Sequence, residues 1–138
     1  MANYATEADV RLKFQLENTD AASTALITSS IDAAHDELLR RLREEFVTAS
    51  PEADVIRGEV LLAGAHVLRS MASKEASEQQ QVSIGGQQVS TNGRFGLLST
   101  AATMAEEKAW DVLAPYVNAH AARDVASATD TVAVLGEV

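Results

Sequence analysis

The stretch "SPEADVIRGEVLLAGAHVLRSMASKEA", residues 50–76, decides the fold because its apolar residues cover more than one side of a helix. One stripe repeats every three or four residues, which is the spacing of an α-helix. This stripe consists of Ile56, Val60, Ala63, Val67 and Met71. The apolar surface is widened by Val55, Leu61, Leu62 and Leu68. Ser50 is a preferred helix cap and Pro51 suits a first helical position, so we predict a buried central helix from 51 to about 76.

Two glycines inside this stretch, Gly58 and Gly64, each cost a helix about 1 kcal/mol relative to alanine. They are tolerated where a second helix approaches closely, so the central helix should have close neighbours. A long helix is predicted before it, from about 20 to 47, with Thr19 or Asp20 as its cap. Its apolar stripe consists of Ile27, Ile31, Ala34, Leu38, Leu42 and Phe46.

A short first helix and a long last helix complete the predicted bundle. Thr6 and Asp9 form a variant of the capping box, which predicts a first helix over about 6–16. Ser99 or Thr100 caps the last helix, which Pro115 kinks or ends. The inward face of that helix comprises Leu98, Ala102, Ala105, Ala109, Leu113 and Tyr116. The sequence therefore predicts a single all-α domain, 1–138, built as a bundle of about four helices, one short and three long.

Between the last two helices, "EQQQVSIGGQQVSTNGRF" alternates apolar and polar residues from 78 to 95. The turn-forming pairs Gly85-Gly86 and Asn92-Gly93 interrupt it, and this pattern predicts a β-hairpin-like insertion over 79–96. The C-terminal segment 123–138 ends in "DTVAVLGEV", where apolar residues again alternate. We predict an extended tail there, which is either disordered or completed by another molecule.

Composition excludes several function classes. The chain carries 20 acidic and 11 basic residues, a net charge of −9, which disfavours direct binding of nucleic acid. It has no cysteine, so it forms neither a disulfide framework nor a thiolate site. No stretch approaches the roughly 18–20 apolar residues that span a bilayer, and the start lacks a signal-peptide pattern. We therefore expect no membrane contact and synthesis in the cytoplasm.

No pattern of catalytic or metal-binding residues is present. A metal site in a helical bundle needs Glu-x-x-His motifs on facing helices. Asp32 stands three residues before His35, but Ala63 stands three before His66, so the second half is missing. No serine stands in Gly-x-Ser-x-Gly, and the glycines match no phosphate-binding loop. We predict a protein that is not an enzyme and uses no cofactor.

The densest basic cluster is "RRLR", residues 40–43, which supplies Arg40, Arg41 and Arg43. Two interpretations are open. The arginines can bind an acidic partner surface or a neighbouring copy of the chain. They can also form ion pairs along their own helix with Asp36, Glu37, Glu44 and Glu45.

The order of elements resembles a known family. A short capped helix "ATEADVRLKF" precedes the helix "DAAHDELLRRL", another long helix, a Gly-rich insertion, and the closing "AWDVLAPY". This order resembles the head–tail connector, or adaptor, proteins of long-tailed bacteriophages, over roughly 6–117. The resemblance implies a structural virion protein of the neck, made in the host cytoplasm, without catalysis or cofactor. It implies a homo-oligomeric ring of about a dozen copies between the portal protein and the next neck or tail-completion protein.

In such a ring, DNA passes through the channel without specific binding, and an acidic wall suits that passage. The resemblance implies that loops and termini bind the neighbouring rings. The candidate interface residues are Arg40, Arg41, Arg43, Val82, Ile84, Gly85, Gly86, Val89, Phe95, Val132, Val134 and Leu135. The alternative is a stand-alone helical binding or regulatory module that uses the hairpin as a recognition loop. An apolar pocket between helices, lined by converging polar groups, would favour that alternative.

Overall fold

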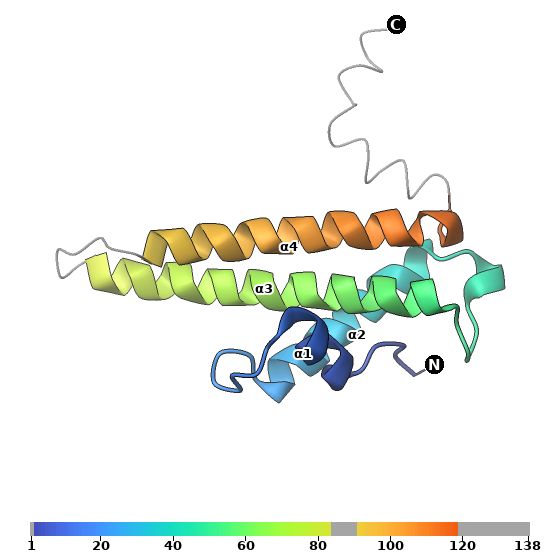
Figure 1. Cartoon of the computed structure of the whole chain (residues 1–138), viewed down its shortest axis with the longest axis horizontal. Coiled ribbons are helices and arrows are strands. Elements are labelled where there is room, and N and C mark those ends of the chain that lie inside the picture. The colour runs from blue at the N-terminus through green and yellow to red at the C-terminus, as the bar shows by residue number, and fades with distance from the viewer. Residues whose placement is uncertain (1, 84–90, 119–138) are drawn as a thin grey trace, which may run out of the picture.

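The computed structural model describes residues 2–83 and 91–118, with side chains for all of these except 78–83 and 91–94. Four α-helices and two short 3-10 helices form the described part: α1 (Glu7–Phe14), α2 (Thr24–Arg41), η1 (Glu44–Phe46), α3 (Ala53–Ser83), α4 (Thr91–Leu113) and η2 (Ala114–Tyr116). Figure 1 shows α3 in the middle, with α4 antiparallel to it on one side and α1 and α2 on the other. The prediction of a helical bundle built around the third helix is confirmed.

The central helix is buried on more than one side, as its sequence predicts. Buried residues of α3 include Val55, Val60, Leu61, Leu62, Ala63, Val67 and Leu68. A Cβ added to Gly58 would overlap the Leu113 side chain of α4, and one added to Gly64 would overlap the Phe14 ring of α1. Both glycines therefore stand where a neighbouring helix approaches closely, which is the role predicted for them.

Small residues bring α4 against α3. Ala102, Ala105, Ala109 and Leu113 of the predicted inward face are buried, and Leu98 and Tyr116 at its ends are half-buried. Pro115 ends the helix as predicted, because α4 stops at Leu113 and the chain continues into η2. Burial of alanine faces permits a close approach of the two helix backbones over their common length.

Several helix boundaries differ from the predictions. The capping box of Thr6 and Asp9 is present, but α1 ends at Phe14 because Gln15 takes a left-handed conformation, φ 55°. The cap of α2 is Ser23, because residues 18–21 form a turn in which the Asn18 side chain accepts hydrogen bonds from the backbone N–H groups of Asp20 and Ala21. Local side-chain to backbone bonds of this kind compete with a helix start.

The far end of α2 also differs, because it stops at Arg41 rather than near residue 47. Leu42 is extended and forms an antiparallel bridge with Val117, so the chain leaves its helix to pair with the segment after α4. At the next junction α3 begins at Ala53, two residues after the predicted start at Pro51. The end of α2 at Arg41 leaves Leu42 and Phe46 of the predicted stripe outside the helix, although Leu42 is still buried and Phe46 half-buried.

The predicted β-hairpin over 79–96 is wrong. The helix α3 continues to Ser83 and α4 begins at Thr91, so both flanks of the predicted hairpin are helical. Within residues 2–83 and 91–118 there is no strand beyond the single bridge of Leu42 and Val117. Glutamate and glutamine favour a helix, and two long helices stabilise each other, whereas a two-stranded ribbon is marginal alone. Residues 84–90, with Ile84, Gly85, Gly86 and Val89, lie outside the described residues, as does the predicted tail over 123–138.

Candidate functional site

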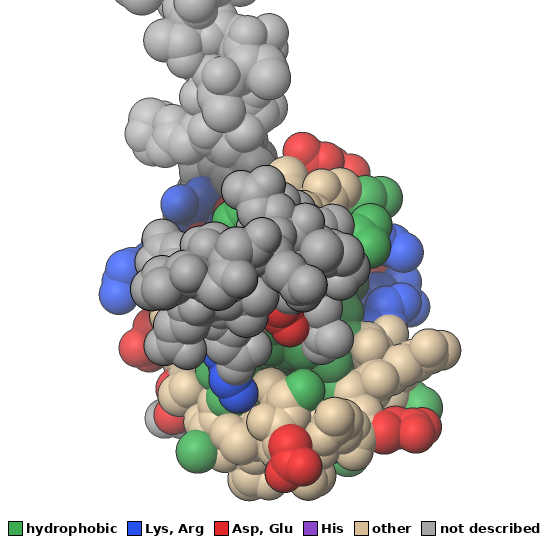
Figure 2. Space-filling view, turned by 90° about the vertical axis from the view of Figure 1, so that its left-hand side faces the viewer, with side chains coloured by type: hydrophobic (Ala, Val, Ile, Leu, Met, Phe, Trp, Pro, Cys, Tyr) green, Lys and Arg blue, Asp and Glu red, His purple; other side chains and the backbone are tan. Residues whose placement is uncertain are grey.

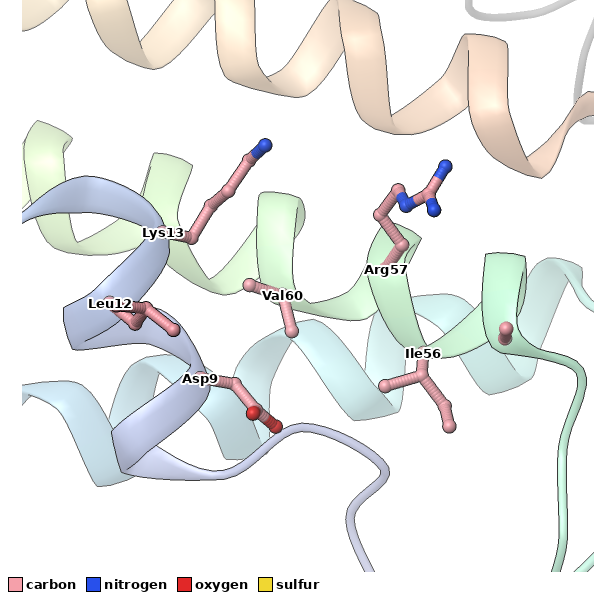
Figure 3. Close-up of a pocket in the computed structure, with 7 residues that line it drawn as sticks. Asp9, Leu12, Lys13, Ile56, Arg57 and Val60 are labelled. Carbon is pink, nitrogen blue, oxygen red and sulfur yellow. The ribbon is translucent and has the colours of Figure 1, made fainter.

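A groove runs between α1, α3 and α4 and consists of two adjoining hollows of 430 and 460 Å³ that share Lys13. We call it the α1 groove. The first hollow is lined by Asp9, Leu12, Lys13, Ala53, Ile56, Arg57 and Val60. The second is lined by Lys13, Phe14, Leu61, Ala101, Met104, Ala105, Glu107 and Lys108. Figure 3 shows Leu12 and Lys13 of α1 beside Val60 and Arg57 of α3 in the first hollow.

Apolar side chains lie open to solvent along this groove. Leu12 is 83% exposed, although its neighbour Val10 is fully buried against the core. Across the groove, Met104 of α4 is 63% exposed. Single exposed leucines are common, but a contiguous apolar surface marks a binding site. The groove is therefore the strongest candidate interaction surface among the described residues.

An exposed apolar stripe on α4 continues from the groove toward the end of the helix pair. Leu97, Ala101 and Met104 are spaced by four and three residues, so they share one side of α4. Leu97 is 73% exposed, and Phe95, one of the predicted interface residues, is 40% exposed. We call Leu97, Ala101 and Met104 the α4 stripe. The spacing of Leu97, Ala101 and Met104 can be read from the sequence, but it did not lead to a prediction of this stripe, because the alanines at 102, 105 and 109 mark the inward face of the helix more strongly.

The rim of the α1 groove carries more positive than negative charge. Lys13, Arg57 and Lys108 face it, against the carboxyl groups of Asp9 and Glu107. In Figure 3, Lys13 and Arg57 point toward α4 along the opening of the first hollow. A local excess of cations stands out in a chain with a net charge of −9. A ligand of this groove should be apolar and carry negative charge.

A buried polar pair lies on the other side of α3. The Glu59 side chain is fully buried, and its Oε1 accepts a 2.6 Å hydrogen bond from Nδ1 of His35 on α2. Its Oε2 accepts from the backbone N–H groups of Tyr4 at 2.7 Å and Ala5 at 2.6 Å. The edge of the Tyr4 ring packs on the His35 ring, with centroids 4.9 Å apart. Glu59 thus fastens the N-terminal segment and α2 to the central helix.

This pair has the contacts of a structural anchor. Three donors engage both oxygens of the Glu59 carboxylate, and neither residue lines a hollow reported above. His35 Nε2 is buried without a hydrogen-bond partner. Within the described part of the chain no cluster of three or more metal-ligating side chains occurs. The sequence interpretation did not single out Glu59, although a lone carboxylate within the apolar run 55–68 was a usable signal.

The basic cluster serves the bundle itself. Arg43 donates to the carbonyl oxygens of Val117 and Pro115, each at 3.2 Å, and pairs with Glu45 at 3.5 Å. The Arg41 guanidinium lies over the ring of the buried Trp110, 4.8 Å from its centroid. Glu45 is one of the predicted acidic partners, but Arg43 and Glu45 both lie after the end of α2, so their pair is not part of a ladder along that helix. The Arg43 side chain also holds the segment after α4. Arg40 is exposed, and its role at an interface stays a prediction.

The other predicted interface residues are only partly described. Val82 belongs to α3, but its side chain is outside the description. Ile84, Gly85, Gly86 and Val89, and also Val132, Val134 and Leu135, lie outside the described residues. The predicted interface set as a whole therefore stays a prediction.

Comparison with models of protein families, with curated proteins and with solved structures found no significant match. In the described part of the chain, no helix is long and apolar enough to cross a membrane. The function has to be argued from the surfaces described above.

Proposed function

We propose that this chain is a structural subunit of a virion ring, the head–tail connector of a tailed bacteriophage. The observation that carries the proposal is the projecting end of the α3–α4 pair. Figure 1 shows this end extending past α1 and α2, so neither of these helices packs on α3 and α4 there. The apolar Leu97 and Phe95 are exposed on it, at 73% and 40%.

A projecting helix pair with exposed apolar residues suits contact between copies. Arg69 and Glu106 form an ion pair that ties α3 to α4 near the start of the projection, so the pair is held as one unit. In the end-on view of Figure 2, hydrophobic side chains are exposed between charged side chains of both signs. A contact between two different faces of neighbouring copies closes into a ring when the rotation between them closes. The α4 stripe supplies one such face.

The ring of about a dozen copies would lie between the portal protein and the next neck or tail-completion protein. Its net charge of −9 per subunit lets DNA pass through the channel without specific binding. Residues near the α3–α4 connection, Val82 to Phe95, and the tail residues Val132, Val134 and Leu135 remain candidate contacts to those partners. The proposal assigns the protein to the virion neck, with no catalysis and no cofactor.

The test is the state of association of the full chain. Light scattering and negative-stain images are recorded from about 10 µM to about 1 mM protein, because association depends on concentration. We expect rings at the high end of this range for the natural chain. The variant Leu97→Glu should remove them, since it places a charge in the apolar contact. Genes for a portal and a major capsid protein beside the gene for this chain are a second expected observation.

Thr103→Glu is the matched control, because Thr103 is exposed on the same helix but lies on a different side from the α4 stripe. It should form rings like the natural chain. A natural chain that stays monomeric throughout the range, in a genome without neighbouring head genes, would contradict the proposal. Rings that persist in Leu97→Glu would show that another face makes the contact.

A stand-alone binding module is the second candidate, and the α1 groove favours it. Its two hollows of 430 and 460 Å³ fall in the usual size range of small-ligand sites, about 300–1,000 Å³. Such a module stays monomeric and binds an apolar ligand beside Met104. Binding of a fluorescent apolar dye that Met104→Glu abolishes, in a chain that forms no rings, would favour this candidate.

A further inference from the structure

The α1 groove is an apolar surface without a cover among the described residues. Its walls come from Leu12 and Phe14 of α1, Ile56 and Val60 of α3 and Met104 of α4. Exposure of such a surface to water is unfavourable in proportion to its apolar area. An occupant that covers it would therefore gain free energy from burial.

The charges along the groove restrict the chemistry of that occupant. Three cationic side chains line the groove, Lys13, Arg57 and Lys108, against the two carboxylates of Asp9 and Glu107. Arg57 also forms an ion pair with Asp54 at 3.5 Å. An apolar segment with carboxylates at its flanks satisfies both the walls and the rim. A basic segment would meet like charge.

The chain itself contains a segment of this composition. Residues 130–138 read "DTVAVLGEV", with apolar side chains at Val132, Val134 and Leu135 between Asp130 and Glu137. No basic residue follows Arg123. The segment is therefore complementary to the groove in hydrophobicity and in the sign of its charge.

The chain length between the bundle and this segment permits the contact within one molecule. Asn118 is held by the Arg41 carbonyl oxygen, at 3.0 Å from its backbone nitrogen and 3.3 Å from Nδ2. Tyr116 donates to Asp54 at 3.4 Å, which places this end of the chain beside the first turn of α3. Ala53 of that same turn lines the groove.

Eleven residues, 119–129, separate Asn118 from the segment and reach at most about 3.3 Å each, or about 36 Å. Ala53–Ser83 contains 31 residues, so the whole of α3 is about 46 Å long at 1.5 Å per residue. The groove begins at the first turn of α3, so the tether covers the distance. Attachment through a short tether also gives the segment an effective concentration in the millimolar range.

We infer that the C-terminal segment 130–138 binds in the α1 groove of its own chain, with Val132, Val134 and Leu135 against Leu12 and Met104. The carboxylates of Asp130 and Glu137 then face the cations of the rim. This contact lies within one subunit and describes the free chain; in an assembled ring, Met104 and the three apolar residues of the segment would exchange it for the contacts proposed above.

The absence of cysteine makes a cross-linking test direct. The full chain carrying Leu12→Cys and Val134→Cys is oxidised with diamide at about 1 µM, where encounters between copies are rare. A disulfide needs the two Cα atoms within about 7 Å, so its rate of formation reports close approach. Leu12 is 83% exposed, so its replacement leaves the core intact. We expect a rapid intrachain disulfide, measured by mass spectrometry and by gel mobility.

The matched control pairs Val134→Cys with Thr103→Cys, an exposed position on the side of α4 that faces away from the groove. The disulfide at position 12 should form at least tenfold faster than at 103, because only one site holds the segment. Added Lys13→Glu should slow the reaction at position 12, since it reverses a rim charge.

Three outcomes overturn the inference. Equal rates at positions 12 and 103 would show a segment that samples both surfaces without binding. A disulfide between two copies, rising with concentration, would show that a second copy fills the groove. An unchanged rate with Lys13→Glu and with Val132→Asp together would show that neither the charges nor the apolar side chains hold the segment. Ring formation is measured separately, so these outcomes leave the proposed function untouched.

Discussion

Replacing Glu59 by alanine tests the most buried interaction of the fold. The side chain has no exposed surface, and its two oxygens accept three hydrogen bonds, from His35, Tyr4 and Ala5. Glu59→Ala removes the acceptor for all three donors and leaves space in the core. Glu59→Gln keeps the shape and one acceptor oxygen, so the two backbone donors retain a partner.

The expected losses differ enough to be separated. Each buried donor left without a partner costs roughly 1–3 kcal/mol, and Tyr4 lies near enough to the surface to recover water. We therefore expect Glu59→Ala to lower the free energy of unfolding by about 3–5 kcal/mol. Glu59→Gln exchanges charge-assisted bonds for neutral ones and should cost about 1–2 kcal/mol. The larger loss is a substantial part of the total stability of about 5–15 kcal/mol of a typical domain.

Urea unfolding followed by tryptophan fluorescence measures both values, because Trp110 is the only tryptophan and is buried in the bundle. Glu107→Ala is the control, since Glu107 is an exposed glutamate within a helix. Its unfolding midpoint should match that of the natural chain closely. A Glu59→Ala chain within about 1 kcal/mol of this control would refute the anchor role of Glu59.

Three further predictions follow from contacts of the bundle. Gly58→Ala should destabilise the fold by about 1–3 kcal/mol in urea unfolding, because its Cβ overlaps Leu113. The same change should cost less when made in a Leu113→Ala chain, where the overlap is removed, and an equal cost in both chains would contradict this. The His66 ring holds the pKa of the Glu37 carboxyl below its usual value, so this group stabilises the fold above its unfolded pKa and loses that effect as the pH falls. Unfolding midpoints from about pH 5 to about pH 3 should therefore fall less in Glu37→Gln than in the natural chain, and parallel curves would contradict this. Arg43→Lys should cost about 1–2 kcal/mol and increase amide exchange after α4, because lysine cannot reproduce the bonds to two carbonyl oxygens; unchanged exchange there would show that the arginine does not hold the segment.

The helices could be predicted from sequence because their signals are local. Apolar residues at spacings of three and four predicted the buried stripes of α2, α3 and α4, and the glycines predicted close helix contacts. The capping box of Thr6 and Asp9, a signal within four residues, correctly predicted the start of α1. One boundary failed because a distant partner decides the conformation, at Leu42, which leaves α2 to pair with Val117.

The hairpin prediction failed for the same physical reason. Alternation over a few residues and the pairs Gly85-Gly86 and Asn92-Gly93 are short-range signals. Packing of α3 on α4 extends over many turns and outweighs them, so helix continues to Ser83 and resumes at Thr91. The α1 groove could not be predicted, because it depends on how α1 lies across α3 and α4. The exposed position of Leu12 follows from that arrangement alone.

The bonds between residues 41–43 and 115–118 have a mechanical consequence. A pull on the chain beyond Asn118 loads its two bonds to Arg41 first, and then the bonds from Arg43 to Val117 and Pro115. These bonds are fastened to the end of α2 rather than to α4. Tension on the C-terminal segment is therefore passed to another helix before it can peel α4 from α3. The helix pair is shielded from force applied at its own end.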